Sequence, residues 1–461
     1  MKYGVFFMKV IVVGCTHAGT AAVEQILQDH PDTEITVYER DDNISFLSCG
    51  IALYLGRKVK HLEDMFYASP KDLEKLGAKV HMKYDVLKID SNKKTVMCEN
   101  MKTHEIVNDS YDKLIMTTGS TVAVPPIMGI SDTRILMCKS YAQAQAIYET
   151  AKEHKHITIV GGGYIGVELA ESYANTDHKV TLIQSRDQVL NNYIDKDTSE
   201  NVTDLLKEHG VDVFLNERVT GFDRDDDDNV LIETNQGDHH ADLVIVCTGF
   251  VANTELLRGQ VDMDRHSAII INEYTQTSNP DIYAAGDACT VNFNPTNKPA
   301  YMPLATNAIR QGALAGINIF GNIQKYMGTQ ATSGMELFGN TLASTGLTLR
   351  HALKDGINAD SVTYHDYYRP DYMPTTEMLT IKLIYNKDNH LILGAQFFSK
   401  HEVAQSANTI SVCIQNKNTI DDLAFMDMLF QPNYDNPFNY LNLVAQQAVA
   451  KERSEKKIKN S

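Results

Sequence analysis

The sequence predicts an α/β protein with two similar parallel-sheet domains and a separate α+β domain at its C-terminal end. Two stretches, beginning at Lys9 and at Ile157, each follow the pattern strand, glycine turn, helix, strand. From about Gln324 onward the pattern changes to strands followed by helices. Two copies of the first pattern in one chain indicate two Rossmann-like dinucleotide-binding domains.

The first unit begins with a β-branched strand, Lys9–Val13, and continues through a helix, Ala18–Asp29, into a second strand, Glu34–Tyr38. Its turn, GCTHAG, keeps the outer glycines of a G-x-G-x-x-G loop, with Thr16 at the middle position. Such glycines allow a tight turn, and the helix N-terminus then directs amide groups at a pyrophosphate. Glu39 follows the second strand, where it is placed to accept from a ribose hydroxyl.

The second unit has a strand at Ile157–Val160, a helix at Tyr164–Asn175 and a returning strand at Val180–Gln184. Its turn, GGGYIG, matches the G-x-G-x-x-G pattern in full. Gln184 stands where an acidic residue would favour NAD over NADP, and Arg186 follows two residues later. A neutral amide does not repel a 2′-phosphate and Arg186 could attract one, but Gln184 could equally just bond a ribose hydroxyl. The sequence therefore leaves the choice between NADH and NADPH open.

Three strands that end in glycine indicate how the domains are connected. Tyr111–Met116 ends in TTGS, Leu243–Val246 ends in CTG, and a third strand within Asp281–Asp287 ends in the sequence AAGD. Pro125 and Pro126 mark a crossover out of the first domain, and the third strand is expected to return to it. We therefore expect a first domain in two parts, 1–120 and 250–323, with an inserted domain at 121–249 and a C-terminal domain at 324–461.

Composition and charge argue against several classes of partner. The formal net charge of −17 repels nucleic-acid phosphates and anionic lipid surfaces, and no Lys/Arg stripe offsets it locally. The acidic run Asp225–Asp228 lies between two strand-like segments, so we expect a solvated hairpin tip rather than a cation site. Neither a nucleic acid nor a membrane partner is expected, and no metal site.

The cysteines indicate a reducing compartment. There are 7 of them, an odd number, and none are spaced as C-x-x-C, so neither a disulfide framework nor a zinc site is expected. The N-terminal stretch lacks signal-peptide features, and no run of about 18 apolar residues occurs, so we expect a cytoplasmic location. Met8 begins MKVIVVG, which runs directly into a strand, so the first seven residues either precede the natural start or form a frayed extension.

One cysteine stands out by its position. Two dinucleotide sites imply hydride exchange between two cofactors, for which nicotinamide and flavin are the obvious pair. Cys49 lies just before the helix-like segment Ile51–Leu55, where amide donors and the helix dipole are expected to lower its thiol pKa. From this segment alone, inert packing is the alternative.

Several motifs together carry a family resemblance. The runs ISFLSCGIALYLG, GCTHAG, GGGYIGVELAE, AAGDA and PLATNAIRQG resemble the NADH oxidase, NADH peroxidase and coenzyme A disulfide reductase family of FAD enzymes. The similarity covers the chain from Met8 to about Ala450, and within the family it looks closest to the water-forming NADH oxidases of lactic acid bacteria.

The resemblance implies specific roles. Cys49 matches a redox cysteine that cycles between thiolate and sulfenic acid, and His17 matches a histidine beside it. Glu39, Asp287 and Lys139 match FAD contacts, Tyr164 matches an aromatic ring that covers the flavin, and Glu168 should lie near the nicotinamide. The full set of expected cofactor-binding residues is Gly14, Thr16, Ala18, Gly19, Glu39, Ser45, Thr118, Gly119, Ser120, Lys139, Asp287, Leu304, Ala305, Thr306, Gly161, Gly163, Tyr164, Ile165, Gly166, Glu168, Gln184, Tyr193, Gly249 and Pro303.

The resemblance also implies an activity. NADH or NADPH would reduce FAD, O2 would be reduced to peroxide, and the Cys49 thiolate would convert the peroxide to water and become sulfenic acid. The classical disulfide reductases need a second thiol a few residues away, but the nearest downstream cysteine is Cys98. A peroxidase or a coenzyme A disulfide reductase stays open as an alternative, since Tyr367 and Tyr434 resemble tyrosines of the latter. A third reading is a redox sensor that binds flavin and nicotinamide with negligible turnover.

The C-terminal domain is expected to form a homodimer, as the resemblance implies. Segment 430–440 would then reach the flavin of the other subunit, with packing inside one chain as the alternative. The sequence does not decide between water and hydrogen peroxide as the product.

Overall fold

A parallel five-stranded sheet forms the first domain in the computed structural model, which describes residues 8–459. The expectation about the first seven residues therefore lies outside the described residues. The strands, in spatial order, are β18 (Ile282–Ala284), β7 (Lys113–Met116), β1 (Lys9–Val13), β2 (Glu34–Glu39) and β3 (Lys79–Met82). Val13 pairs with Tyr38 on one side and with Met116 on the other, so three carboxyl ends meet at one edge of the sheet.

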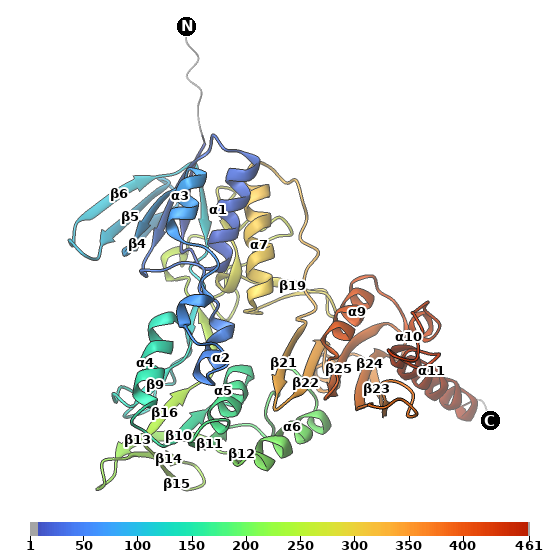
Figure 1. Cartoon of the computed structure of the whole chain (residues 1–461). Helices are drawn as coiled ribbons and strands as arrows, with labels where there is room; N and C mark the ends of the chain where they lie inside the picture. Colours follow the sequence, from blue (N-terminus) through green and yellow to red (C-terminus); the bar gives the residue numbers. More distant parts are fainter. Residues whose placement is uncertain (1–7, 460–461) are drawn as a thin grey trace.

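Each face of this sheet is covered by a different layer. Val10 and Val12 pack under the helices α1 (His17–Asp29) and α7 (Ala305–Asn318), which lie side by side in Figure 1. An added Cβ at Gly312 would lie 2.2 Å from the Ala18 carbonyl oxygen, so the glycine permits the close approach of α7 to α1. Ile11 and Val13 face an antiparallel sheet made of β4 (Tyr84–Asp90), β5 (Thr95–Asn100) and β6 (Ile106–Ser110).

The second parallel sheet belongs to the inserted domain. Its strands, in spatial order, are β12 (Val211–Leu215), β11 (Lys179–Gln184), β10 (His156–Val160), β16 (Leu243–Val246) and β9 (Ile135–Met137). Helices α4 (Tyr141–Ala151), α5 (Tyr164–Ala174) and α6 (Lys196–Glu208) contribute to the core on one face. The three-stranded sheet of β13 (Val219–Arg224), β14 (Val230–Thr234) and β15 (Asp238–Ala241) covers the other.

Two antiparallel strands connect the parallel-sheet domains. The chain leaves the first domain through β8 (Ser120–Val122) and returns through β17 (Phe250–Ala252), which pairs with it. It then re-enters the first sheet as β18, beside β7. The predicted fold class, with one dinucleotide domain inserted in another, is therefore confirmed, whereas the four domain boundaries stay predictions.

The C-terminal domain is an antiparallel sheet backed by helices, shown in orange and red in Figure 1. Its strands, in spatial order, are β21 (Ser333–Leu337), β22 (Asn340–Gly346), β25 (Ile392–Ser399), β24 (Met378–Asn386) and β23 (Ala359–Tyr367). The helices are α8 (Leu349–Lys354), α9 (Ala404–Gln415), α10 (Ile420–Ala424) and α11 (Tyr440–Lys459). None of the helices in the described part of the chain combines the length and the hydropathy needed to cross a lipid bilayer.

Helix α11 continues to Lys459. Ion pairs hold its charged last turns to the sheet: Lys451 contacts Asp360 at 2.6 Å, and Glu455 contacts Lys387 at 2.7 Å. The remaining short elements are η1 (Ser48–Gly50), α2 (Ile51–Leu55), η2 (Leu62–Met65), α3 (Pro70–Leu76), η3 (Glu255–Leu257), η4 (Gly286–Ala288), β19 (Val291–Phe293) and β20 (Lys298–Ala300).

Candidate functional site

The first glycine loop brings helix α1 against the end of β7. Gly14 has a φ of +86°, and a Cβ there would lie 2.6 Å from the Thr117 carbonyl oxygen. A Cβ at Gly19 would lie 2.2 Å from the Gly14 carbonyl oxygen. Thr16, at the N-cap of α1, is exposed and makes no side-chain cap, which leaves the amide groups of this 13-residue helix available to a ligand.

Glu39 lies at the carboxyl end of β2, beside this loop. Its carboxylate accepts hydrogen bonds from the Cys15 amide at 2.6 Å and the Asp41 amide at 2.8 Å. The side chain is buried, and burial raises the pKa of Glu39. The carboxylate is thereby fixed next to the loop, where a ribose hydroxyl could donate to it.

Three predicted contacts converge in one hydrogen-bonded cluster. The Ser120 hydroxyl donates to Asp287 at 2.7 Å, and the Lys139 ammonium donates to Ser120 at 2.8 Å and to Asp287 at 3.2 Å. The Lys139 nitrogen also lies 4.0 Å from the centre of the Phe250 ring. These residues come from both connecting strands, from η4 and from the segment after β9, so the fold unites parts of the chain that are far apart in sequence.

Helix α7 packs against η4, which carries Asp287, and has a second uncapped N-terminus. Leu304 is its N-cap and Ala305 and Thr306 begin the helix, again without a side-chain cap. Pro303 precedes it and is partly buried. The free amide groups at the start of a 14-residue helix favour negative charge nearby, such as that of a reduced flavin.

Of the other predicted FAD contacts in the first domain, one lines open space, whereas the side chains of two others already make hydrogen bonds within the protein. Gly119 has a φ of +65° and an added Cβ there would meet nothing within 4 Å, so it lines an open space. Thr118, by contrast, donates its hydroxyl to the Asn253 carbonyl at 2.5 Å. Ser45 is buried, and its hydroxyl exchanges two hydrogen bonds with the Ala68 backbone at 2.7 and 2.9 Å. The side chains of Thr118 and Ser45 therefore stabilise the wall of the site.

Cys49 lies in the single turn η1 that leads directly into α2. It is the only exposed cysteine of the seven, which are all free and all within the described chain. Helix α2 packs against α5 of the inserted domain, where the Ser172 hydroxyl donates to the Ala52 carbonyl at 2.8 Å. Tyr164, Glu168 and Ser172 are spaced four residues apart on α5, so they share one face of this helix, and Ser172 of that face contacts α2.

The prediction that the thiol pKa of Cys49 is lowered is wrong. Although the side chain is exposed on one side, the protein packed around it raises the thiol pKa, and the charge of Glu168 raises it further. Helix α2 spans only five residues, so it supplies little dipole to offset these effects. Lys139 acts in the opposite direction and favours the thiolate.

His17 begins helix α1 and is buried. Its Nδ1 bonds the Tyr67 hydroxyl at 2.9 Å, whereas its Nε2 is buried with no partner in the described part of the chain. Burial lowers the pKa of His17, so the ring is neutral at pH 7. No hydrogen bond joins it to Cys49 between residues 8 and 459, but Asp287 and Lys139 influence the pKa of both groups.

The second glycine loop has the shape of a pyrophosphate site. A Cβ added at Gly161 would lie 2.4 Å from the Cys247 carbonyl oxygen. A Cβ added at Gly166 would lie 1.8 Å from the Gly161 carbonyl oxygen. At Gly163 and at Gly249 it would meet nothing within 4 Å. The outer glycines therefore allow close packing, while the middle one leaves open space at the start of α5.

Aromatic residues lie at the start of α5. Tyr164 contacts Tyr193 edge to face with the ring centres 4.5 Å apart, and Ile165 follows it as a partly buried residue. Ser333 of the C-terminal domain donates a hydrogen bond to the Tyr164 hydroxyl at 3.0 Å. Ser333 and Tyr67 are site residues that the sequence motifs did not indicate, because neither lies in a recognisable motif.

The end of β11 carries the residues relevant to nicotinamide choice. The buried Gln184 amide donates to the Gln188 carbonyl at 3.3 Å, so it is turned toward its own loop. Ser185 and Arg186 are exposed, and the Arg186 side chain has no ion pair to any residue that the structure describes. A free guanidinium thus stands next to a neutral amide at the position where an acid would exclude a 2′-phosphate.

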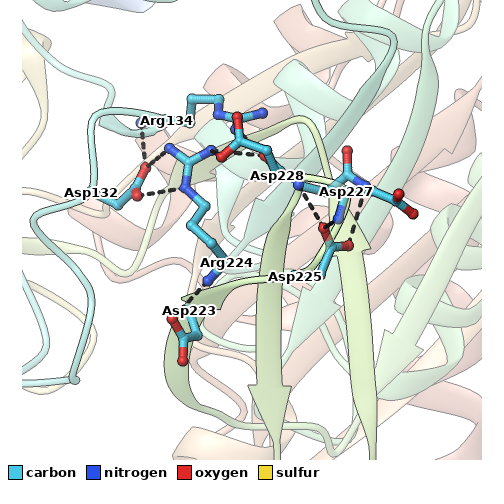
Figure 2. A network of polar contacts seen from close by, with 8 residues as sticks. Asp132, Arg134, Asp223, Arg224, Asp225, Asp227 and Asp228 are labelled. Atoms are coloured by element: carbon cyan, nitrogen blue, oxygen red, sulfur yellow. Dashed lines mark hydrogen bonds and ion pairs between the residues drawn. The ribbon is translucent and has the colours of Figure 1, made fainter.

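The acidic run forms the tip of the β13–β14 hairpin, as expected, and Asp226, Asp227 and Asp228 are exposed. Part of the run also makes hydrogen bonds and ion pairs (Figure 2). Arg134 contacts Asp228 at 2.6 Å, and Arg224 bonds Asp132 through two nitrogens at 2.7 and 2.8 Å. Asp225 accepts from Asn229 and from His240, which leaves only part of the run free. These contacts connect the β13–β14 hairpin to the loop around Asp132, so the cluster has an architectural role.

A further acidic group lies in the C-terminal domain. Asp360, Glu452 and Glu455 are close enough to hold an ion together. However, Lys387 and Lys451 already pair with them, and the Tyr385 hydroxyl donates to Glu452 at 2.8 Å. The group is therefore an ion-pair network between α11 and the sheet.

Comparisons with known proteins agree with this arrangement. Residues 8–312 match the family model described as pyridine nucleotide-disulphide oxidoreductase, and residues 337–440 match the dimerisation domain of the same family. An NADH oxidase of Enterococcus faecalis is 50% identical over 443 residues, which cover 96% of this chain and 99% of the relative.

Two solved structures are also similar. The water-forming NADH oxidase from Lactobacillus brevis bound to NADH has 53% identity and a TM-score of 0.96, covering 97% of this chain and 99% of that one. An engineered variant of it, a water-forming NADPH oxidase bound to NADPH, has the same identity and TM-score and covers 97% of this chain and 100% of that one.

Proposed function

Since the chain belongs to the pyridine nucleotide-disulphide oxidoreductase family, we propose that it is an NADH oxidase that reduces O2 to water. The observation that carries this proposal is similarity at 50 to 53% identity, over nearly the whole chain, to NADH oxidases that include a water-forming one. The exposed Cys49 beside α5 supports it, because a single reactive sulfur is what the second half of the reaction needs.

The first domain would hold FAD, and its residues fit this cofactor. The uncapped start of α1 suits the pyrophosphate, and Glu39 suits the adenosine ribose. The cluster of Ser120, Lys139 and Asp287 would contact the flavin end, toward which the uncapped start of α7 also points. When bound, FAD would supply hydride acceptance from the nicotinamide and electron transfer to oxygen.

The inserted domain would bind the nicotinamide nucleotide. Gly161, Gly163 and Gly166 would receive the pyrophosphate, and Gly249 leaves open space near it. Tyr164, at the start of α5, is fixed by Ser333 of the C-terminal domain and by Tyr193. This ring is placed to shield the reacting centre until the nicotinamide enters.

Cys49 would decide whether the product is peroxide or water. Its thiolate attacks one peroxide oxygen, an S–O bond forms, the O–O bond breaks, and hydroxide leaves and takes a proton. A second hydride equivalent from NADH then returns the sulfenic acid to thiolate with loss of another water. When the Tyr67 hydroxyl donates to Nδ1 of His17, Nε2 carries the ring proton and can donate it to a peroxide oxygen.

We also propose that the chain accepts NADPH in addition to NADH. The engineered L. brevis variant that binds NADPH replaces an aspartate with alanine and introduces two arginines. This chain has the neutral Gln184 and the unpaired Arg186 at the end of β11, where an acid would favour NADH over NADPH. The electrostatic obstacle to a 2′-phosphate is thus absent, and a cation that can bind it is present.

The assembly would be a homodimer, because the chain carries the dimerisation domain of its family. Tyr367 and Tyr434 of that domain are exposed in the single chain, as is expected of residues that a partner subunit would cover. A cytoplasmic location rests on the seven free cysteines, which suit a reducing compartment.

Stoichiometry tests the activity against its relatives. With excess oxygen, the protein is expected to consume two NADH per O2, and catalase should return no oxygen. One NADH per O2 with oxygen recovered by catalase would show a peroxide-forming enzyme instead. Faster anaerobic NADH oxidation with hydrogen peroxide or coenzyme A disulfide than aerobic oxidation with O2 would favour the peroxidase or the disulfide reductase.

A further inference from the structure

The segment that follows β11 borders the second glycine loop. A Cβ added at Gly162 would lie 3.1 Å from a methyl carbon of Val189 and 3.3 Å from the Gln184 side chain. The Leu190 amide also donates to the Gly162 carbonyl at 2.7 Å. Because this loop carries the expected pyrophosphate site and Gln184 ends the strand, residues 184–190 lie where the adenosine ribose of a bound nucleotide is expected.

Two neighbouring charged side chains in this segment differ in their contacts. Asp187, the one acidic residue of 184–190, pairs with Arg350 of the C-terminal domain, whose Nη1 lies 3.2 Å from a carboxylate oxygen. Arg186 is exposed and has no ion pair to any residue between 8 and 459. The acid next to Arg186 in the chain is thus engaged by a different cation, which leaves the Arg186 guanidinium available to an anion.

The backbone of Arg350 is fixed beside the nucleotide-binding domain. Its amide donates to the buried Asp195 carboxylate at 3.1 Å, and the Leu349 amide donates to the same carboxylate at 3.0 Å. The side chains of Asp187 and Arg350 are themselves 42 and 56% exposed. An ion pair this exposed contributes little to stability, so its importance would come from its effect on local charge.

A bound 2′-phosphate would be sensitive to the charge of Asp187. Arg186 and Asp187 stand on successive Cα atoms about 3.8 Å apart, which is well within the Debye length of about 8 Å at physiological ionic strength. Without Arg350, the Asp187 carboxylate would repel a 2′-phosphate and would be free to pair with Arg186 in its place. NADH has no 2′-phosphate, so its binding would be affected far less.

We propose that Arg350 is a specificity-determining residue for NADPH, an inference that rests on the proposed use of this nucleotide. Its guanidinium neutralises Asp187 and keeps Arg186 free for the 2′-phosphate. The C-terminal domain thereby takes part in the choice of nicotinamide nucleotide, through an ion pair to the domain that binds it.

Isothermal titration of the FAD-loaded protein with NADP+ and with NAD+, neither of which reduces the flavin, tests this role. Arg350→Gln should weaken NADP+ binding by about 3- to 10-fold and change NAD+ binding by less than about 2-fold. The loss should shrink at high salt, because added ions screen the Asp187 carboxylate. Equal changes for both nucleotides, or no change for either, would overturn the inference, since a merely structural role does not distinguish between them.

A double variant separates neutralisation of Asp187 from a direct contact between Arg350 and the phosphate. Asp187→Asn removes the negative charge, so adding Arg350→Gln to it should cause no further loss of NADP+ binding. A loss of the same size in both backgrounds would show that Arg350 acts without Asp187, which contradicts the inference.

Lys354 provides the matched control, because it is exposed on the same helix α8 and has no ion pair to residues 8–459. Lys354→Gln removes one positive charge and should leave NADP+ binding unchanged, whereas a loss equal to that of Arg350→Gln would refute the role of the ion pair. A wild-type protein that neither binds NADP+ nor oxidises NADPH would contradict the proposed use of NADPH itself, and the inference with it.

Discussion

At the scale of single residues, Gly163 reserves the space for the nicotinamide nucleotide. Its φ of −79° and ψ of −172° suit any residue, and an added Cβ would meet nothing within 4 Å, so the fold does not require glycine here. Gly163→Ala should therefore keep its melting temperature but bind NADH about 10-fold more weakly, because the methyl group occupies the place of the pyrophosphate. Isothermal titration beside a thermal melt measures both, and unchanged NADH affinity would contradict this use of the loop.

Gln184 and Arg186 predict how the protein selects its nicotinamide. Gln184→Asp should weaken NADPH binding by about 10- to 100-fold because a carboxylate repels the 2′-phosphate, with little loss of NADH binding. Arg186→Ala should weaken NADPH binding by a smaller factor, because it removes an attractive charge without adding a repulsive one. Dissociation constants for both nucleotides give the answer, and equal losses for NADH and NADPH would refute the assignment.

Single residues also show where sequence reasoning ends. The glycine loops, Glu39 and Cys49 could be recognised because each has a fixed place in a local pattern. The surroundings of Cys49 could not, since the pKa of its thiol depends on Glu168, which is distant in sequence. Tyr67 and Ser333 were missed for the same reason, because their roles come from tertiary contacts to His17 and Tyr164.

At the scale of elements, one buried aspartate connects the inserted domain to the C-terminal domain. Asp195 accepts from the Leu349 and Arg350 amides at the start of α8, at 3.0 and 3.1 Å, and from Gln396 of β25 at 2.8 Å. Asp195→Asn turns an amide donor toward these donors, so the free energy of unfolding should fall by about 1 to 3 kcal/mol.

The neighbouring Asp197 provides the control. It pairs with Lys382 at 2.9 Å but its side chain is 53% exposed, so Asp197→Asn should cost less than about 1 kcal/mol. Denaturant unfolding followed by circular dichroism compares the two variants. Equal losses would show that the contact between these domains does not depend on the buried carboxylate.

The elements differ in how well the sequence predicted them. Strands such as β1 and β16 are short, fully apolar runs, and the pattern located them within one residue. The sheet β4–β6 was not recognised, because β6 alternates exposed and half-buried residues and resembles a loop in sequence. The end of α11 could not be predicted from the sequence, since its last turns depend on ion pairs to other elements.

At the scale of the whole molecule, an apolar surface on the C-terminal domain predicts the subunit contact. Five aromatic or aliphatic side chains between α10 and α11 are 47 to 70% exposed, namely Phe425, Leu429, Phe430, Tyr434 and Phe438. Such a patch is typical of a protein interface, and it lies in the family's dimerisation domain. The insertion of one domain in another could be inferred from the sequence, whereas this surface needed the structure.

The double variant Leu429→Asp/Phe430→Asp should convert the dimer to a monomer, because burying two unpaired carboxylates is costly. Met128→Asp, at an apolar residue of the inserted domain that is 77% exposed, should leave the dimer intact. Sedimentation velocity distinguishes the species. A wild-type monomer, or a double variant that still forms a dimer, would contradict the assigned interface.

The most direct test of the account concerns the product of Cys49→Ser. Since this one sulfur is proposed to turn peroxide into water, the variant should still bind FAD and oxidise NADH but release hydrogen peroxide, with one NADH consumed per O2. The measurement is oxygen uptake with NADH oxidation, followed by catalase to reveal the peroxide. A variant that still consumes two NADH per O2 and releases no peroxide would show that water forms without Cys49.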